Sequence, residues 1–113
     1  MDGSALYSLD PARIYDQIVK AGEDWADKQA AADLLEETRK SVLAKLMIDA
    51  AATTQAGREM QALADPTYTE FVEGMVQARK ASNKARVRYD SAKVLAELRR
   101  SQEATRRAEA NIR

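Results

Sequence analysis

The fold is decided by residues 65–113, which read DPTYTEFVEGMVQARKASNKARVRYDSAKVLAELRRSQEATRRAEANIR. Asp65 followed by Pro66 is a typical helix start, because Asp caps the first turn and Pro fits the first helical position. After Pro66 there is no further proline, and Gly74 is the only glycine. The stretch therefore predicts one continuous helix over residues 66–112, about 70 Å long at ~1.5 Å per residue.

A second long helix is predicted over residues 10–53. Asp10 and Pro11 repeat the Asp-Pro start signal. Apolar residues then recur at alternating spacings of four and three, the period of one helical face: Ile14, Ile18, Ala21, Trp25, Ala32, Leu35, Val42 and Leu46. Residues 54–64 predict a short connecting helix, with Thr53 or Thr54 as its N-cap. Residues 1–9 are expected to form a short leader.

Composition supports an all-α fold in one domain covering residues 1–113. The chain has 22 alanines, one Phe, one Trp and two prolines, and Glu, Lys, Arg and Leu are abundant. These are residues that favour long helices. A chain of 113 residues is also too short for more than one ordinary domain.

Periodicity and charge both predict that the two long helices pair as an antiparallel, coiled-coil-like hairpin. Residues 1–37 carry nine acids and three bases, whereas residues 80–113 carry ten bases and four acids. Folding back at the connector would bring these oppositely charged segments together, with Trp25 beside Val94 and Leu35 beside Lys84.

Apolar residues beyond a single seam predict that hairpins pack on each other. The surplus residues are Leu34, Leu43 and Met47 on the first helix and Val87, Val94, Leu95 and Leu98 on the second. We therefore expect a homo-oligomer, most simply a dimeric four-helix bundle.

A basic residue recurs every seven positions on the last helix, which places these residues on nearly one face. This basic row consists of Arg79, Arg86, Lys93, Arg100 and Arg107. In one interpretation the row pairs with acids of the first helix, namely Asp16, Glu23, Asp27 and Glu36. In the other it follows a nucleic-acid backbone, as helical rows of Lys and Arg do.

The end of the last helix is the candidate contact surface, because it is expected to extend beyond the first helix. Its arginines, here called the basic tip, are Arg99, Arg100, Arg106, Arg107 and Arg113. They could contact nucleic acid or a protein partner, and the segment could equally fray. Single-strand binding usually adds aromatic stacking platforms, but this helix offers only Tyr68, Phe71 and Tyr89, which disfavours a dedicated single-strand binder.

No catalytic, cofactor or metal site is predicted, and we expect the protein not to be an enzyme. There is no His and no Cys, so conventional bases for Ser or Thr and the commonest metal ligand are missing. The acid pairs Glu23–Asp27 and Asp33–Glu37 have helical spacing but lie on the polar face. No signal peptide and no apolar run of ~20 residues is present, so we expect a soluble, cytoplasmic protein without a membrane partner.

The run YDSAKVLAELRRSQEATRRA at residues 89–108 resembles the end of small all-helical proteins encoded by phages and prophages. The segment from Glu59 to Tyr68 is similar to their middle section, and the resemblance covers about residues 35–110. It implies a phage accessory role near recombination or DNA processing, in the cytoplasm of a bacterial host. We therefore expect a non-enzymatic interaction or scaffold protein; the alternative is a nucleic-acid-binding accessory protein that uses the basic face of the last helix.

Overall fold

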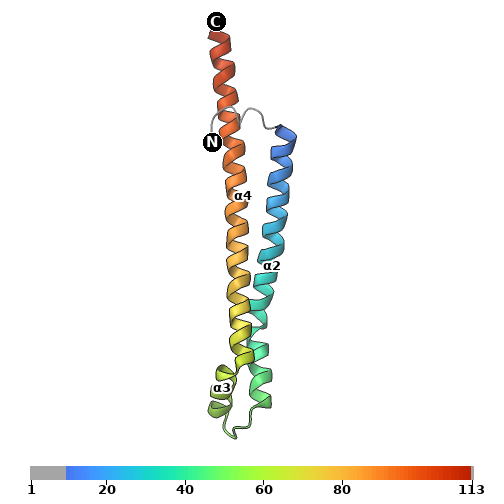
Figure 1. The fold of residues 1–113 in the computed structure, drawn as a ribbon, viewed down its shortest axis with the longest axis vertical. Coiled ribbons are helices and arrows are strands. Elements are labelled where there is room, and N and C mark those ends of the chain that lie inside the picture. Colours follow the sequence, from blue (N-terminus) through green and yellow to red (C-terminus); the bar gives the residue numbers. More distant parts are fainter. Residues whose placement is uncertain (1–9, 113) are drawn as a thin grey trace. The chain divides into compact units, whose positions relative to one another are not determined.

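The computed structural model describes residues 10–112, which form three helices and no strand. Helix α2 spans Pro11–Asp49, α3 spans Gln55–Ala64 and α4 spans Pro66–Ile112 (Figure 1). The predicted all-α hairpin with a short connecting helix is confirmed. The expected leader at residues 1–9 lies outside the described residues.

All three helix starts use side-chain caps. The Asp10 carboxylate accepts a hydrogen bond from the backbone N–H of Ala12 at 3.1 Å, and Asp65 accepts from Thr67 N–H at 2.8 Å. The Thr54 hydroxyl accepts from Gly57 N–H at 3.0 Å. Each bond satisfies a donor that the first helical turn leaves without a backbone partner.

Helix α2 ends at Asp49, four residues before the predicted end at residue 53. The physical reason lies at Ala52, whose backbone is bound by side chains of α3. Its N–H donates to Gln61 Oε1 at 3.0 Å, and its carbonyl accepts from Arg58 Nε at 2.8 Å. These bonds replace the helical bonds that a longer α2 would have used, so the chain turns earlier.

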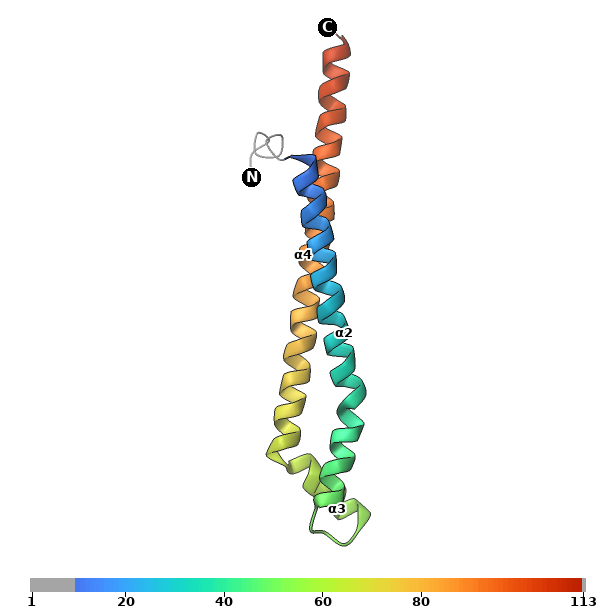
Figure 2. The same cartoon turned by 90° about the vertical axis from the view of Figure 1, so that its right-hand side faces the viewer.

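The long helices take part in two compact units. The connector unit contains residues 27–83: the second part of α2, all of α3 and the first part of α4. Figure 2 shows α3 beside the end of α2. The residues buried here are Ala32, Ala62, Tyr68 and Ser82. The small side chains of Ala32, Ala62 and Ser82 let helices approach closely.

The terminal unit contains residues 10–26 and 84–112, where the first part of α2 runs antiparallel to the second part of α4 (Figure 1). Ile14 and Ala85 are buried in it. The rings of Trp25 and Tyr89 stack with centroids 5.6 Å apart. Gly22 lies beside Tyr89, so close that a Cβ added to it would be 3.1 Å from Tyr89 Cε1.

The pairing register differs from the prediction. Trp25 contacts Tyr89, five residues earlier on α4 than the predicted partner Val94. The predicted register corresponds to a first helix that reaches residue 53; because α2 ends earlier, at Asp49, the fold-back point moves. Residues 104–112 are all exposed, and Figure 1 shows this end of α4 extending past the first turn of α2.

Two glycine substitutions test the close contact at Gly22. A Cβ at Gly74 meets no atom within 4 Å, so Gly74→Ala should raise the free energy of unfolding by about 1 kcal/mol through helix propensity alone. Gly22→Ala should raise the free energy of unfolding clearly less, because its methyl group would crowd the ring of Tyr89, which stacks on Trp25.

Urea unfolding followed by circular dichroism measures both changes. Trp25 is the only tryptophan, so its fluorescence should shift in Gly22→Ala and stay constant in Gly74→Ala. Equal stabilisation by the two substitutions would show that the predicted crowding at Gly22 does not exist.

Candidate partner-binding surface

The basic row of α4 makes one strong connection to α2, at Arg79 in the connector unit. Arg79 Nε donates to Glu36 Oε1 at 2.9 Å, and Arg79 Nη2 donates to Glu36 Oε2 at 3.0 Å. The same Nη2 donates to Asp33 Oδ1 at 2.5 Å. The guanidinium thus forms a bidentate pair with the Glu36 carboxylate, the arrangement that its planar geometry favours.

This pairing shifts the ionisation of both partners. The hydrogen bond from Arg79 is the main cause that lowers the pKa of Glu36. Hydrogen bonds to Glu36, and then to Asp33, raise the pKa of Arg79 above its already high ordinary value. All three side chains keep contact with solvent, at 31% exposure for Arg79, 51% for Asp33 and 45% for Glu36, so the bridge sets orientation more than stability.

Most of the basic row forms no ion pair with α2, which corrects the interpretation that it neutralises the acidic helix; Arg86 instead lies over the ring of Trp25 in α2, 5.8 Å from its centroid. Arg86 and Lys93 both pair with Asp90 of their own helix, at 3.9 and 3.6 Å, and Arg100 pairs with Glu97 at 3.3 Å. Acids three or four residues away on one helix are nearer than those across the hairpin.

The acids of α2 also find other partners than those predicted. Asp16 pairs with Lys20 at 2.9 Å. Arg88, outside the basic row, pairs with Asp24 at 3.4 Å. Of the four acids assigned to the row, only Glu36 forms an ion pair with it among the described residues.

The basic tip divides into different environments. Arg99 is 11% exposed and hydrogen-bonds to Glu103; with Ile14 and Tyr15 it lines a groove of about 310 Å³ in the terminal unit. Arg100 is 77% exposed, and Arg106 and Arg107 lie on the exposed end of α4. Arg113 is outside the described residues. The tip is therefore not one uniform cationic surface.

Helix α4 also carries a row of outward-facing aliphatic side chains that no other part of the described structure covers. Val87, Val94 and Leu98 are 63%, 58% and 50% exposed. With Asp90, Ser91 and Leu95 they line an open groove of about 510 Å³. We call Val87, Ser91, Val94, Leu95 and Leu98 the apolar stripe.

The apolar stripe lies on the side of α4 turned away from α2. Spacings of four, three and four from Val87 through Ser91 and Val94 to Leu98 keep the stripe on one helical face, and Leu95 lies at its edge. Ala85 is buried and Tyr89 stacks on Trp25 on the other side. From the sequence, Val87, Val94, Leu95 and Leu98 are surplus to one seam and are expected to pack hairpins on each other, whereas contact with nucleic acid or another partner is expected at the arginines of the basic tip.

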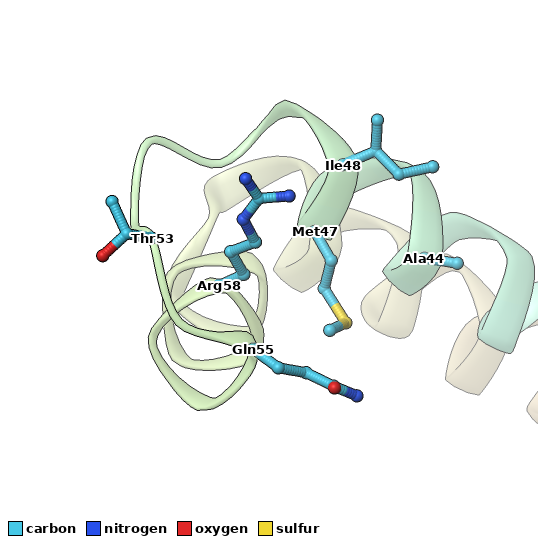
Figure 3. Close-up of a pocket in the computed structure, with 6 residues that line it drawn as sticks. All are labelled: Ala44, Met47, Ile48, Thr53, Gln55 and Arg58. Atoms are coloured by element: carbon cyan, nitrogen blue, oxygen red, sulfur yellow. The ribbon is translucent and has the colours of Figure 1, made fainter.

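A second exposed groove lies at the connector. Figure 3 shows it lined by Ala44, Met47 and Ile48 of α2, Thr53, and Gln55 and Arg58 of α3. Its volume is about 550 Å³, and Ile48 is 74% exposed. The guanidinium of Arg58 points toward the connector (Figure 3), where its Nε binds Ala52, so this side chain has a structural role.

Within residues 10–112, no group of three or more carboxylates is placed to hold a metal ion. Over the same range, no helix has the length and apolar character that a bilayer crossing requires.

Comparison with known proteins finds no matching family model, no matching curated protein and no matching solved structure.

The Arg79 bridge predicts a specific pH dependence. Because the folded pKa of Glu36 is lowered, the bridge stabilises the fold above the unfolded pKa of Glu, about 4.3, and this stability is lost as the pH falls through the folded pKa. Arg79→Gln should lower the thermal midpoint by a few degrees at pH 7, and its difference from the unsubstituted chain should shrink toward pH 3.

Arg100→Gln is the matched control, because among residues 10–112 the ion pair of Arg100 is with Glu97 of its own helix. Thermal scans between pH 3 and pH 7 measure both variants. An Arg79→Gln effect no larger than that of Arg100→Gln, or one independent of pH, would contradict the assigned role of the bridge.

Proposed function

We propose that this protein is a non-enzymatic interaction or scaffold protein and that the apolar stripe of α4 binds its protein partner. The observation that carries the proposal is the outward exposure of Val87, Val94 and Leu98 on one face. Adjacent exposed aliphatic side chains rimmed by polar residues mark interaction surfaces.

The energetics favour a helical partner. Covering a half-exposed Val or Leu contributes about 1 kcal/mol. The groove beside Ser91 lies between larger side chains of the stripe. A partner helix can place its own apolar residues against such a face at matching three- and four-residue spacing.

The resemblance of residues 35–110 to small phage and prophage proteins supports a phage-encoded accessory role. It makes a bacterial cytoplasm the setting that we propose. A role near recombination or DNA processing would be carried out by holding another protein in place.

The second candidate function is nucleic-acid binding by the basic tip. Arg100 is 77% exposed, and Arg107 lies seven residues further along the same face of the exposed end of α4. Cations at this spacing can follow a phosphate backbone. Glu97 offsets part of the charge of Arg100 at 3.3 Å, which favours the protein-binding proposal.

Photocrosslinking in phage-infected or lysogenic cells tests the primary proposal. A photoreactive amino acid at position 94 should form a covalent adduct with a protein, because this position lies at the centre of the apolar stripe. The same group at position 104, on the exposed end of α4, is the control and should form far less adduct. Equal labelling from both positions, or no protein adduct from position 94, would contradict the proposal.

A salt titration of DNA binding tests the second candidate. If the basic tip binds phosphates, affinity should fall steeply with salt, with a log–log slope of about −0.9 for each phosphate neutralised. Arg100→Glu with Arg107→Glu should then weaken binding and reduce that slope. Lys40→Glu with Lys45→Glu changes the net charge equally at exposed sites of α2 and should have little effect. No binding at about 50 mM salt removes this candidate.

A further inference from the structure

We infer that the apolar stripe is the docking surface for a second copy of this chain, with the two α4 helices antiparallel. This inference rests on the proposed function and names the partner. It draws on two features of residues 10–112: the small size of the buried core, and the arrangement of large and small side chains along the stripe.

The hairpin buries too little apolar side chain for a chain of its size. Within residues 10–112, the buried apolar residues are Ile14, Ala32, Ala62, Tyr68 and Ala85. Three of these five are alanines, whereas Val87, Val94 and Leu98 are half-exposed or more. Chains of about a hundred residues ordinarily bury a larger core. A second copy can supply the missing contacts and is always present at the concentration of the chain itself.

The stripe is complementary to itself when one copy is reversed. If Ser91 of one copy lies level with Val94 of the other, then Val87 lies level with Leu98. The two-fold axis then passes between positions 92 and 93, and every contact occurs twice, as in an isologous dimer. Ser91 is the small residue in the groove lined by the stripe, so Val94 of the second copy can enter beside it as a knob enters a hole.

A polar rim flanks the stripe on one side, where Asp90, Lys93 and Glu97 line a groove together with Val94 and Leu98. Asp90 and Glu97 pair with bases of their own helix, so their charge is offset within each copy. The cationic groups of Arg86 and Lys93 lie over the rings of Trp25 and Tyr89, on the side of α2.

A parallel, in-register arrangement lacks the size complementarity of the reversed one. It places Ser91 against Ser91 and Val94 against Val94, so the small residue of one copy does not meet a larger residue of the other. The alternation of large and small side chains therefore favours the antiparallel arrangement.

Light scattering of the full chain tests the association. The expected mass is twice the chain mass of 12.5 kDa. Val94→Lys would place a charge in the dry centre of the interface on both copies, so the dissociation constant should rise by roughly 100-fold or more. Circular dichroism should stay helical, because Val94 is 58% exposed within one hairpin. Ala104→Lys, on the exposed end of α4, is the matched control and should remain a dimer.

Disulfide trapping tests the antiparallel register, since the chain has no cysteine of its own. Val87→Cys and Leu98→Cys chains, oxidised when mixed, should form a covalent heterodimer. Each variant oxidised alone should give little covalent dimer, because its two cysteines lie about 16 Å apart along the axis at ~1.5 Å per residue. A parallel pair would give the reverse pattern.

The inference is overturned by a monomeric mass, by equal behaviour of Val94→Lys and Ala104→Lys, or by disulfides that form in each variant alone in place of the mixed one. A monomer whose position 94 still crosslinks to a different protein in cells removes the second copy and leaves the proposed function standing. Failure to crosslink to any protein removes both.

Discussion

The binding of Ala52 by α3 is the constraint on which the pairing of the long helices depends. Gln61 accepts from the N–H of this residue and Arg58 donates to its carbonyl, so α2 cannot continue through it. With α2 ending at Asp49 and α4 beginning at Pro66, the fold-back point is set. The stacking of Trp25 on Tyr89 and the bridge between Glu36 and Arg79 both agree with that point.

Small residues at the helix contacts explain where the aliphatic side chains lie. Ala32, Ser82 and Ala85 are buried because close helices leave room only for small side chains. Gly22 allows the ring of Tyr89 to reach the backbone of α2. The larger residues of α4, Val87, Val94 and Leu98, are therefore not needed between the helices and remain on the opposite face. That division between a narrow inner contact and an exposed apolar face underlies the proposed partner-binding role.

The ion pairs are determined more by which acids lie nearby on the same helix than by the opposite net charges of the two ends of the chain. The two ends of the sequence have opposite net charge, which favours the hairpin at long range. At short range the bases of α4 bind acids of the same helix three or four residues away, as Lys93 does with Asp90. Arg79 is the member of the basic row that forms ion pairs with α2, because Asp33 and Glu36 both lie opposite it and Glu36 accepts hydrogen bonds from its guanidinium through two oxygens. Arg86 contacts α2 in another way, over the ring of Trp25.

The sequence by itself determined the three helices, their capped starts and the antiparallel hairpin, because Asp-Pro signals, a Thr cap and a helical apolar period are local properties of the chain. It also showed that Val87, Val94, Leu95 and Leu98 are apolar residues in excess of those that a single contact between the two helices can bury. The end of α2, the register and the choice of ion pairs were decided only by tertiary structure, because they depend on contacts of α3 with Ala52 and on which side chains meet across the hairpin. The exposure of the arginines in the basic tip was decided in the same way. Arg99 is nearly buried because it packs against α2, whereas the neighbouring Arg100 is exposed.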